Sequence, residues 1–267
     1  MSTADNRYTL ITGATSGIGY ELAKLFAEDD HDLIIVARHE EELEDTATKL
    51  AHYGISIVPI AVDLSLPEGP FYLYEQVKQK NLSVEILVND AGQANYGKFA
   101  KTDLQKDIAD IQLNVTSVIV LTKLFLQDML AQNKGRILEL ASLASLYPAP
   151  LEAVYGGTKA FVLSFTEALR NELKDTAVTV TALLPGPTDT DFFNKAGAEN
   201  THMAQDMDLS DPAKVARDGY KALMRGEGNV VSGLKNKLMA GLSHILPESA
   251  NAAAMRMQTE PTRKNKE

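Results

Sequence analysis

Tyr155 and Lys159 lie four residues apart in the segment YGGTK (155–159), where an amphipathic helix is expected to begin. Four residues make about one helical turn, so the phenol and the ammonium can share one face of that helix. A tyrosine hydroxyl ionises near pH ~10, and a neighbouring positive charge lowers that pKa. The spacing therefore fits a general acid–base with a tuned pKa, and it also fits an ordinary pair on a helix surface.

A glycine-rich segment, TGATSGIG (12–19), joins a predicted strand to a predicted helix. Glycines in such a turn let the backbone approach a pyrophosphate that rests on the helix N-terminus. Their order here is G-x-x-x-G-x-G rather than the common G-x-G-x-x-G. We expect the turn to bind a dinucleotide through Gly13, Thr15, Ser16, Gly17, Ile18 and Gly19.

The type of nucleotide depends on the residue at the end of the second predicted strand. An acid there binds the ribose hydroxyls of NAD, whereas a basic residue accepts the 2′-phosphate of NADP. Arg38 holds that position, and Glu40 and Glu41 fit the first turn of the next helix, where the dipole favours acids. We therefore expect NADP(H). NAD(H) remains the alternative, because Ser16 is neutral where a second base could have reinforced the phosphate site.

Alternating strands and helices must position these residues. Short apolar runs predict strands at 8–12, 32–37, 55–62, 84–89, 135–141 and 178–184, with a weaker one at 229–233. Helical periodicity predicts helices at 18–29, 40–53, 68–80, 103–132, 156–174 and 211–226. Because this alternation indicates βαβ units and a parallel sheet, we expect one doubly wound α/β domain over residues 1–267.

Two segments depart from the alternation. Residues 185–210 are long and polar, and such a segment inside a compact domain is functional or disordered, so we expect a mobile cover over a site. Residues 234–257 have an amphipathic pattern that Pro247 interrupts, carried by Leu234, Leu238, Leu242, Ile245 and Leu246. Three roles are open for this segment: packing against the core or a subunit, a lid over the substrate, or contact with a membrane surface.

Composition excludes several functions. The 267 residues carry a net charge of −10 without a basic stripe, so no nucleic-acid partner is expected. Cysteine is absent, which excludes disulfides and thiolate chemistry, and the five histidines lack metal-ligand spacing, so no metal is expected. The start of the chain lacks a signal-peptide pattern, and residues 115–130 are broken by Lys123 and Asp128. We expect a cytoplasmic protein.

The motifs, taken in chain order, resemble those of the short-chain dehydrogenase/reductase family. They are TGATSGIG (12–19), NDAG (89–92), Asn114 in LNVTS, Ser142, YGGTK (155–159) and PGPTDT (185–190), and the resemblance covers residues 7 to about 235. Ser142 precedes Tyr155 by thirteen residues (155 − 142), the separation that this family uses. The resemblance implies a Rossmann-type, three-layer fold with a mainly parallel, seven-stranded sheet. It also implies hydride transfer between a nicotinamide and a carbonyl or secondary alcohol.

The resemblance assigns roles to individual residues. Tyr155 would be the catalytic acid/base, and Ser142 would donate a hydrogen bond to the substrate carbonyl. Lys159 would hold the nicotinamide ribose and lower the pKa of Tyr155, while Asn114 would support a water linking Lys159 to solvent. Further cofactor contacts are implied for Asp63, Leu64, Asn89, Ala91, Gly92, Pro185, Gly186 and Thr188.

Two positions depart from the family pattern. Asp90 replaces a common asparagine, and Ala141 replaces a frequent serine. Ser145 offers another hydroxyl, but it precedes Tyr155 by ten residues, so we favour Ser142. A cofactor-binding sensor without turnover is the alternative from another functional class, since a fold alone does not establish activity.

The resemblance also concerns partners. The long predicted helices, 103–132 and 156–174, resemble those that pair subunits in this family, which implies a homodimer or homotetramer. Substrate specificity should lie in residues 93–97, 143–152 and 189–210. The apolar content of residues 143–154 favours a fairly hydrophobic carbonyl or alcohol.

Overall fold

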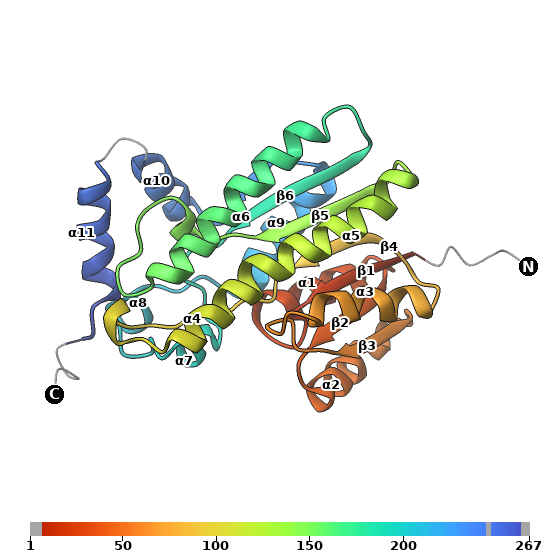
Figure 1. Ribbon diagram of the computed structural model, residues 1–267, viewed down its shortest axis with the longest axis horizontal. Helices are drawn as coiled ribbons and strands as arrows, with labels where there is room; N and C mark the ends of the chain where they lie inside the picture. Colours follow the sequence, from red (N-terminus) through yellow and green to blue (C-terminus); the bar gives the residue numbers. More distant parts are fainter. Residues whose placement is uncertain (1–6, 244–246, 263–267) are drawn as a thin grey trace, which may run out of the picture.

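The computed structural model describes residues 7–243 and 247–262, and Figure 1 shows a parallel sheet covered by helices. Its seven strands are β1 (Arg7–Thr12), β2 (Asp32–Ala37), β3 (Ile57–Ala61), β4 (Ser83–Asn89), β5 (Gly135–Leu140), β6 (Val178–Leu184) and β7 (Asn229–Val231). They form one sheet in the order β3-β2-β1-β4-β5-β6-β7, and every neighbouring pair is parallel. The prediction of a seven-stranded parallel sheet is confirmed.

Each central strand is apolar on both faces, because helices cover both sides of the sheet. One face is covered by α1 (Gly17–Glu28), α2 (Glu40–Leu50) and α9 (Pro212–Arg225), whose buried side chains pack with those of Ile11 and Ile35. The other is covered by α3 (Gly69–Gln79), α5 (Ser117–Ala131) and α6 (Ala153–Glu172), which pack on Leu10 and Ile34. Neighbouring residues of one strand thus belong to opposite cores, as the pleat of a strand requires.

The register brings the motif residues to one edge of the sheet. Thr12, the last residue of β1, is paired with Val36 of β2 on one side and with Asn89 of β4 on the other. The strand order reverses at this point, since the chain goes from β1 outward to β3 and returns to β4. The turn after β1, Arg38 and Asp90 therefore leave the sheet at its carboxyl edge, where doubly wound folds bind ligands.

The predicted helix 103–132 is divided. It consists of α4 (Leu104–Ile111), a π-helical turn, η3 (Gln112–Thr116), and α5. A single π-helical turn inside an α-helix often marks a functional site, and this one contains Asn114. By length and mean hydropathy the stretch Leu104–Ala131 meets the criteria for a membrane span, but 44% of its most apolar window is buried, as in a core helix.

The two segments outside the alternation are helical. Residues 185–210 contain α7 (Phe192–Ala196) and α8 (His202–Gln205). The C-terminal segment is two helices, α10 (Leu234–Ser243) and α11 (Glu248–Thr259), and Pro247 precedes the second because a proline ends helix propagation. Leu234 and Leu238 are 85% and 67% exposed, so these two side chains do not pack on the core of this chain, and contact with a subunit or with a membrane surface stays open for them. Ile245 and Leu246 lie outside the described residues.

Three short 3₁₀ helices complete the described elements: η1 (Ala51–Tyr53), η2 (Phe99–Lys101) and η4 (Leu143–Ser145). In Figure 1, α7, α8 and α11 lie together at one end of the molecule, beside the N-terminal ends of α4 and α6. This end faces the carboxyl edge of the sheet, and the cavity described below lies there.

Candidate active site

A cavity of about 970 Å³ opens at the carboxyl edge of the sheet. Its walls come from the turn after β1, the ends of β2, β4 and β5, the start of α6 and the segment after β6. Fifteen of the predicted cofactor residues line it, and they are Gly13, Thr15, Ser16, Gly17, Ile18, Arg38, Asp63, Leu64, Ala91, Gly92, Tyr155, Lys159, Pro185, Gly186 and Thr188. The structure thus collects residues from six separate segments around one space.

The glycine-rich turn has the shape of an anion cradle. Gly13 and Gly17 have φ angles of +73° and +56°, a region of backbone conformation that glycine adopts more readily than residues with a side chain. Ser16 precedes α1 without capping it through its side chain, and the first turn of α1 carries no acid. Gly17 and Ile18 of that turn line the cavity, and the first N–H groups of a helix have no partner within it, so this turn fits a pyrophosphate.

Gly19 is needed for packing rather than as a cavity wall. A Cβ added there would lie 2.4 Å from the carbonyl oxygen of Gly13 and 2.5 Å from Oδ2 of Asp90. Only glycine lets α1 approach the turn this closely, which is the role of the last glycine in dinucleotide-binding turns. Of the predicted cofactor residues, Gly19 and Asn89 are the two that do not line the cavity.

The end of the cavity where we expect the adenosine carries an arginine, Arg38, and an acid, Asp63. Arg38 is exposed, lines the cavity, and makes no hydrogen bond or ion pair to another described residue. Asp63 lines the same end and accepts hydrogen bonds from the backbone N–H and the hydroxyl of Ser65, at 2.9 and 2.6 Å. Glu42, which the sequence did not single out, also lines it and accepts from the Thr15 hydroxyl at 3.2 Å.

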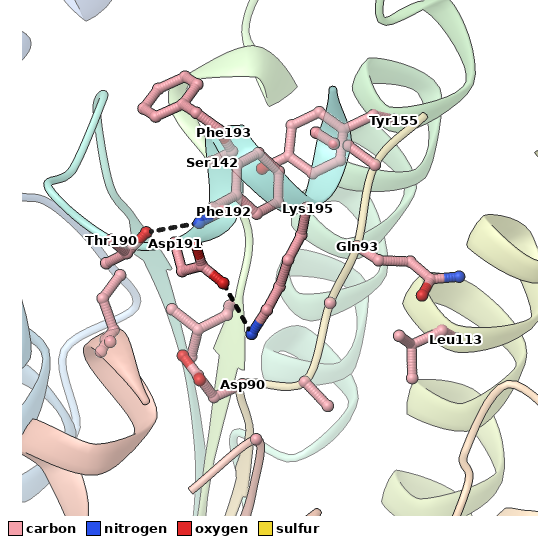
Figure 2. A pocket seen from close by; sticks show the side chains of 18 of the residues that line it. Asp90, Gln93, Leu113, Ser142, Tyr155, Thr190, Asp191, Phe192, Phe193 and Lys195 are labelled. Carbon is pink, nitrogen blue, oxygen red and sulfur yellow. Dashed lines mark hydrogen bonds and ion pairs between the residues drawn. The ribbon is translucent and has the colours of Figure 1, made fainter. Parts of the chain in front are cut away.

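Ser142, Tyr155 and Lys159 all line the cavity, and Figure 2 shows the first two of them. Helix α6 begins at Ala153, three residues earlier than predicted, so Tyr155 and Lys159 both lie within its first two turns. The Lys159 ammonium is 5.8 Å from the centre of the Tyr155 ring and donates to the carbonyl of Leu140 at 2.6 Å. Ser142, just after β5, accepts from the backbone N–H of Ala144 at 3.1 Å.

The pKa of Tyr155 is raised, against the expected lowering. Burial is the main cause, and the nearby Glu152 and Tyr147 act in the same direction, while Ser142 lowers this pKa. Burial likewise lowers the pKa of the Lys159 ammonium to about 8, because it disfavours the charged form. Desolvation therefore outweighs the effect that we expected Lys159 to have on the phenol.

Two acids act on Lys159, namely Asp90, which lines the cavity, and Glu139, which is buried in β5. Burial raises the pKa of Asp90 and of Glu139 to about 7, and both carboxyls favour the charged form of Lys159. Glu139 accepts hydrogen bonds from Asn89 at 3.1 Å and from Thr122 at 2.7 Å, so the side chain of Asn89 supports this network. The one sequence signal for Glu139 was an acid inside the apolar run GRILELA (135–141).

Asn114 is buried and lies behind the cavity wall. Its amide donates to the carbonyl of Gln93 at 2.8 Å and to the hydroxyl of Thr158 at 3.1 Å. Its carbonyl oxygen accepts from the Gln93 backbone N–H at 3.0 Å. Asn114 therefore fixes the loop after β4 relative to α6, and its expected support of a water stays a prediction.

The structure distinguishes the two candidate serines. Ser142 lines the cavity, whereas the Ser145 hydroxyl donates to the carbonyl of Lys159 at 2.8 Å and accepts from the backbone N–H of Ser142 at 3.3 Å. Ser145 thus joins the end of β5 to α6. This geometry supports the choice of Ser142 made from its spacing.

Residues 185–210, called the cover below, lie over this catalytic region. The ring of Phe192 in α7 lies 5.3 Å from that of Tyr155, centroid to centroid (Figure 2). Asp191 and Lys195 of the cover form an ion pair at 3.4 Å. Phe193, Ala196 and Met203 add buried apolar surface to the same region.

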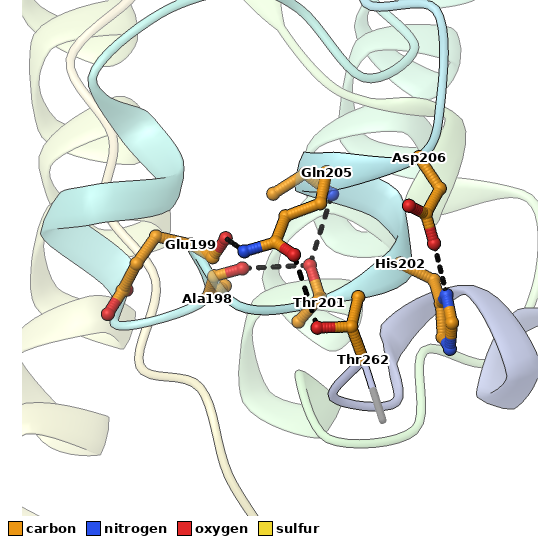
Figure 3. Close-up of polar contacts among 8 residues, drawn as sticks. Ala198, Glu199, Thr201, His202, Gln205, Asp206 and Thr262 are labelled. Atoms are coloured by element: carbon orange, nitrogen blue, oxygen red, sulfur yellow. Dashed lines mark hydrogen bonds and ion pairs between the residues drawn. The ribbon is translucent and has the colours of Figure 1, made fainter. Parts of the chain in front are cut away.

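The C-terminal residues hold the cover in place, which the sequence did not decide. The hydroxyl of Thr262 donates to the side chain of Gln205 in α8 at 3.1 Å, within a polar network that also contains Thr201 and Ala198 (Figure 3). The Tyr96 hydroxyl donates to the carbonyl of Thr259 at 2.6 Å. Three C-terminal side chains also line the cavity, namely Met239, Met255 and Gln258.

Comparison with known proteins agrees with this architecture. A family model described as short chain dehydrogenase matches residues 7–201. The uncharacterized oxidoreductase YvrD of Bacillus subtilis is 35% identical over 185 residues, which cover 69% of this chain and 70% of that protein. A probable NADP-dependent dehydrogenase of Haemophilus influenzae is 34% identical over 178 residues, which cover 66% of this chain and 69% of its own.

A solved structure extends the similarity beyond the matched segment. The short-chain dehydrogenase from Sphingobium yanoikuyae in complex with NADPH has a TM-score of 0.80 and 26% identity to this chain. The alignment covers 90% of this chain and 96% of that one. The chain therefore belongs to the short-chain dehydrogenase family of oxidoreductases.

Proposed function

We propose that this protein is an NADP(H)-dependent oxidoreductase that interconverts a carbonyl and a secondary alcohol, with Tyr155 as the general acid–base. The observation that carries the proposal is that Ser142, Tyr155 and Lys159 line the same cavity as the glycine-rich turn. A dinucleotide whose pyrophosphate rests on α1 and a substrate beside Tyr155 would then share one space.

Reduction places a hydride on the carbonyl carbon and a proton on the oxygen, and NADP(H), when bound, supplies or accepts that hydride. As the bond forms, the carbonyl oxygen gains negative charge. The Ser142 hydroxyl stabilises that charge by hydrogen bonding, and the Tyr155 hydroxyl delivers the proton. Oxidation of the alcohol reverses each of these steps.

The electrostatics of the site provide the protonated donor that reduction requires. Because burial raises the pKa of Tyr155, the phenol is protonated at neutral pH and is ready to donate. Lys159 sits on the same helix face and keeps its charge with the help of Asp90 and Glu139. Its bond to Leu140 holds the ammonium where a nicotinamide ribose would lie.

Preference for NADP(H) rests on Arg38. Its guanidinium is exposed at the adenosine end of the cavity and makes no bond to another described residue, so it is free for a 2′-phosphate. The name of the Haemophilus influenzae relative and the NADPH in the Sphingobium yanoikuyae structure point in the same direction. NAD(H) is the alternative cofactor.

A homodimer or homotetramer would cover apolar side chains that this chain exposes. Leu104, Ile108 and Ile111 of α4 are 65%, 50% and 46% exposed, and Phe161 of α6 is 37% exposed. Apolar surface of this extent on two neighbouring helices is typical of a protein interface. We place the interface on α4, α5 and α6.

The test is consumption of NADPH with a panel of aldehydes, ketones and sugars. We expect turnover of apolar ketones or aldehydes by the wild-type enzyme, and loss of at least a thousandfold in kcat/KM for Tyr155→Phe. Binding of NADPH to Tyr155→Phe, followed by fluorescence, controls for folding. Turnover of polar sugars alone would contradict the apolar substrate, and equal turnover by Tyr155→Phe would contradict the role of Tyr155.

A further inference from the structure

The part of the cavity beside Tyr155 is an apolar chamber with one exceptional side chain. Its walls are the apolar side chains of Ala94, Phe193, Ala196, Met203 and Met255. Glu152 lines the same cavity and is 6% exposed. A carboxyl in such surroundings is costly unless it has a hydrogen-bonding or charged partner.

Glu152 has no such partner within the described part of the chain. Its side chain makes no hydrogen bond or ion pair with any described residue. Although Glu152 precedes α6 as its N-cap residue, its carboxylate does not cap the helix. Burial alone raises its pKa to about 7. The bonding capacity of this carboxyl is therefore left for a molecule that enters the chamber.

The backbone around Glu152 is fixed from both sides. The carbonyl of Leu151 accepts from the Gly97 backbone N–H at 2.8 Å, and that of Pro150 accepts from the Thr259 hydroxyl at 2.9 Å. Leu151 has a φ of 70°, which is strained for a residue with a side chain and persists only where the surroundings impose it. These contacts fix the main chain that places Glu152 at the chamber.

We propose that Glu152 determines specificity by accepting a hydrogen bond from a hydroxyl or a protonated amine on an otherwise apolar carbonyl substrate. This inference deepens the proposed function and rests on it for the reacting carbonyl. Glu152 is close enough to influence the phenols of both Tyr155 and Tyr96 electrostatically. A substrate with its carbonyl at Tyr155 would thus present its donor towards Tyr96 and α11.

Hydroxyl and amine donors share this chemistry and differ in strength. A protonated amine would pair with the ionised carboxylate and could also contact aromatic rings that line the same cavity, Tyr147 and Phe192 among them. A hydroxyl would make a weaker, neutral donor bond. An alkyl group of the same size would leave the carboxyl without a partner, so the enzyme should discriminate against it.

The experiment uses ketones of equal size that differ in one group. The first set is α-aminoacetophenone, α-hydroxyacetophenone and propiophenone, and the second set carries the same groups one carbon further from the carbonyl. Turnover with NADPH and, separately, calorimetric binding to the protein are measured for wild type and Glu152→Leu, which removes the acceptor. Asp110→Asn is the control, because Asp110 is another buried acid of the cavity, whose charged form is favoured by hydrogen bonds from Gln93 and from the backbone of Asn95.

We expect at least one donor-bearing ketone to exceed its alkyl analogue tenfold in kcat/KM and in affinity. Glu152→Leu should reduce that ratio below threefold, and Asp110→Asn should keep it. Equal affinity for the donor and alkyl members of both sets, or an unchanged ratio in Glu152→Leu, would overturn the inference. Donor-dependent binding through Glu152 without any NADPH consumption would support the inference and contradict the proposed function, so the two failures are distinct.

Discussion

Lys159 donates a hydrogen bond of 2.6 Å to the main-chain carbonyl of Leu140, the last residue of β5. This bond holds the ammonium at the end of the strand, 5.8 Å from the centre of the Tyr155 ring. The pKa of Lys159 thus depends on its burial and on two acids, Asp90 and Glu139, more than on the phenol.

The pH dependence of reduction should follow this lysine. Its pKa is lowered to about 8, so the ammonium loses its proton as the pH rises through that value, and kcat/KM should fall on the alkaline side. Asp90 raises the pKa of Lys159, so Asp90→Asn should move this decline to lower pH. Steady-state pH profiles of both proteins measure the shift. An alkaline limb that stays in place, or moves to higher pH, would be inconsistent with this account.

Cofactor selection can be tested by changing Arg38 and Glu42, two residues of opposite charge at the end of the cavity where we expect the adenosine. Arg38→Ala should weaken NADPH at least tenfold, about 1.4 kcal/mol, while NADH affinity changes little. Glu42→Gln should strengthen NADPH, since it removes a negative charge from the same end of the cavity. Fluorescence titration gives each Kd at a fixed salt concentration. The role of Arg38 fails if its removal weakens both cofactors equally or if NADH already binds the wild type as tightly.

The close approach of α1 makes Gly19→Ala a damaging change. An added Cβ would lie 2.4 Å from the carbonyl oxygen of Gly13, so the turn must shift and NADPH binding should fall by at least tenfold. Gly157→Ala in α6 is the matched control, because a Cβ there meets nothing within 4 Å. That control should raise stability by about 0.5–1 kcal/mol through helix propensity. Similar NADPH affinity in Gly19→Ala and wild type would show that the turn does not form this cradle.

Glu152 should affect the pH dependence of stability as well as substrate specificity. Its pKa is raised from 4.5 to about 7 by burial, so the folded state binds more protons than the unfolded state between these values. The free energy of unfolding is therefore highest below pH ~4.5, and it falls as the pH rises to about 7 because Glu152 must then ionise in its buried position. Glu152→Gln should remove this loss and gain about 1–3 kcal/mol relative to wild type between pH 4 and pH 8.

Denaturant unfolding at the two pH values measures that gain. The phenols of Tyr96 and Tyr155, which also interact with Glu152, have raised pKa values and do not ionise in this range. An equal difference between variant and wild type at both pH values would mean that the carboxyl is already paired or exposed in solution.

The sequence predicted the framework of the site but not all of its walls. The strands, the glycine-rich turn and the pair Tyr155 and Lys159 have local signals in periodicity and spacing, and these were sufficient for the sheet and for the catalytic region. Glu42 and Glu139 had no comparable signal, because an acid on a helix or inside a strand becomes part of a site only through its tertiary neighbours.

The C-terminal segment shows the same limit. Its amphipathic pattern left three roles open, and the structure shows Met255 and Gln258 of α11 lining the cavity while Leu234 of α10 is exposed. Hydrogen bonds such as that from Thr262 to Gln205 decide the arrangement, and they join residues far apart in the chain. The raised pKa of Tyr155 was also missed, since burial of the phenol depends on Phe192 and the other residues around it.

The central claim is that a hydride passes from NADPH to a substrate carbonyl while Tyr155 donates the proton. Transfer of an isotope label tests this claim most directly. NADPH that carries deuterium at both hydrogen positions of nicotinamide C4 is incubated with the protein and an apolar ketone, and the alcohol is analysed by mass spectrometry. The account predicts deuterium on the carbinol carbon with wild type, and its loss with Tyr155→Phe although that variant still binds NADPH. Alcohol without deuterium, or the same labelled yield from Tyr155→Phe, would contradict it.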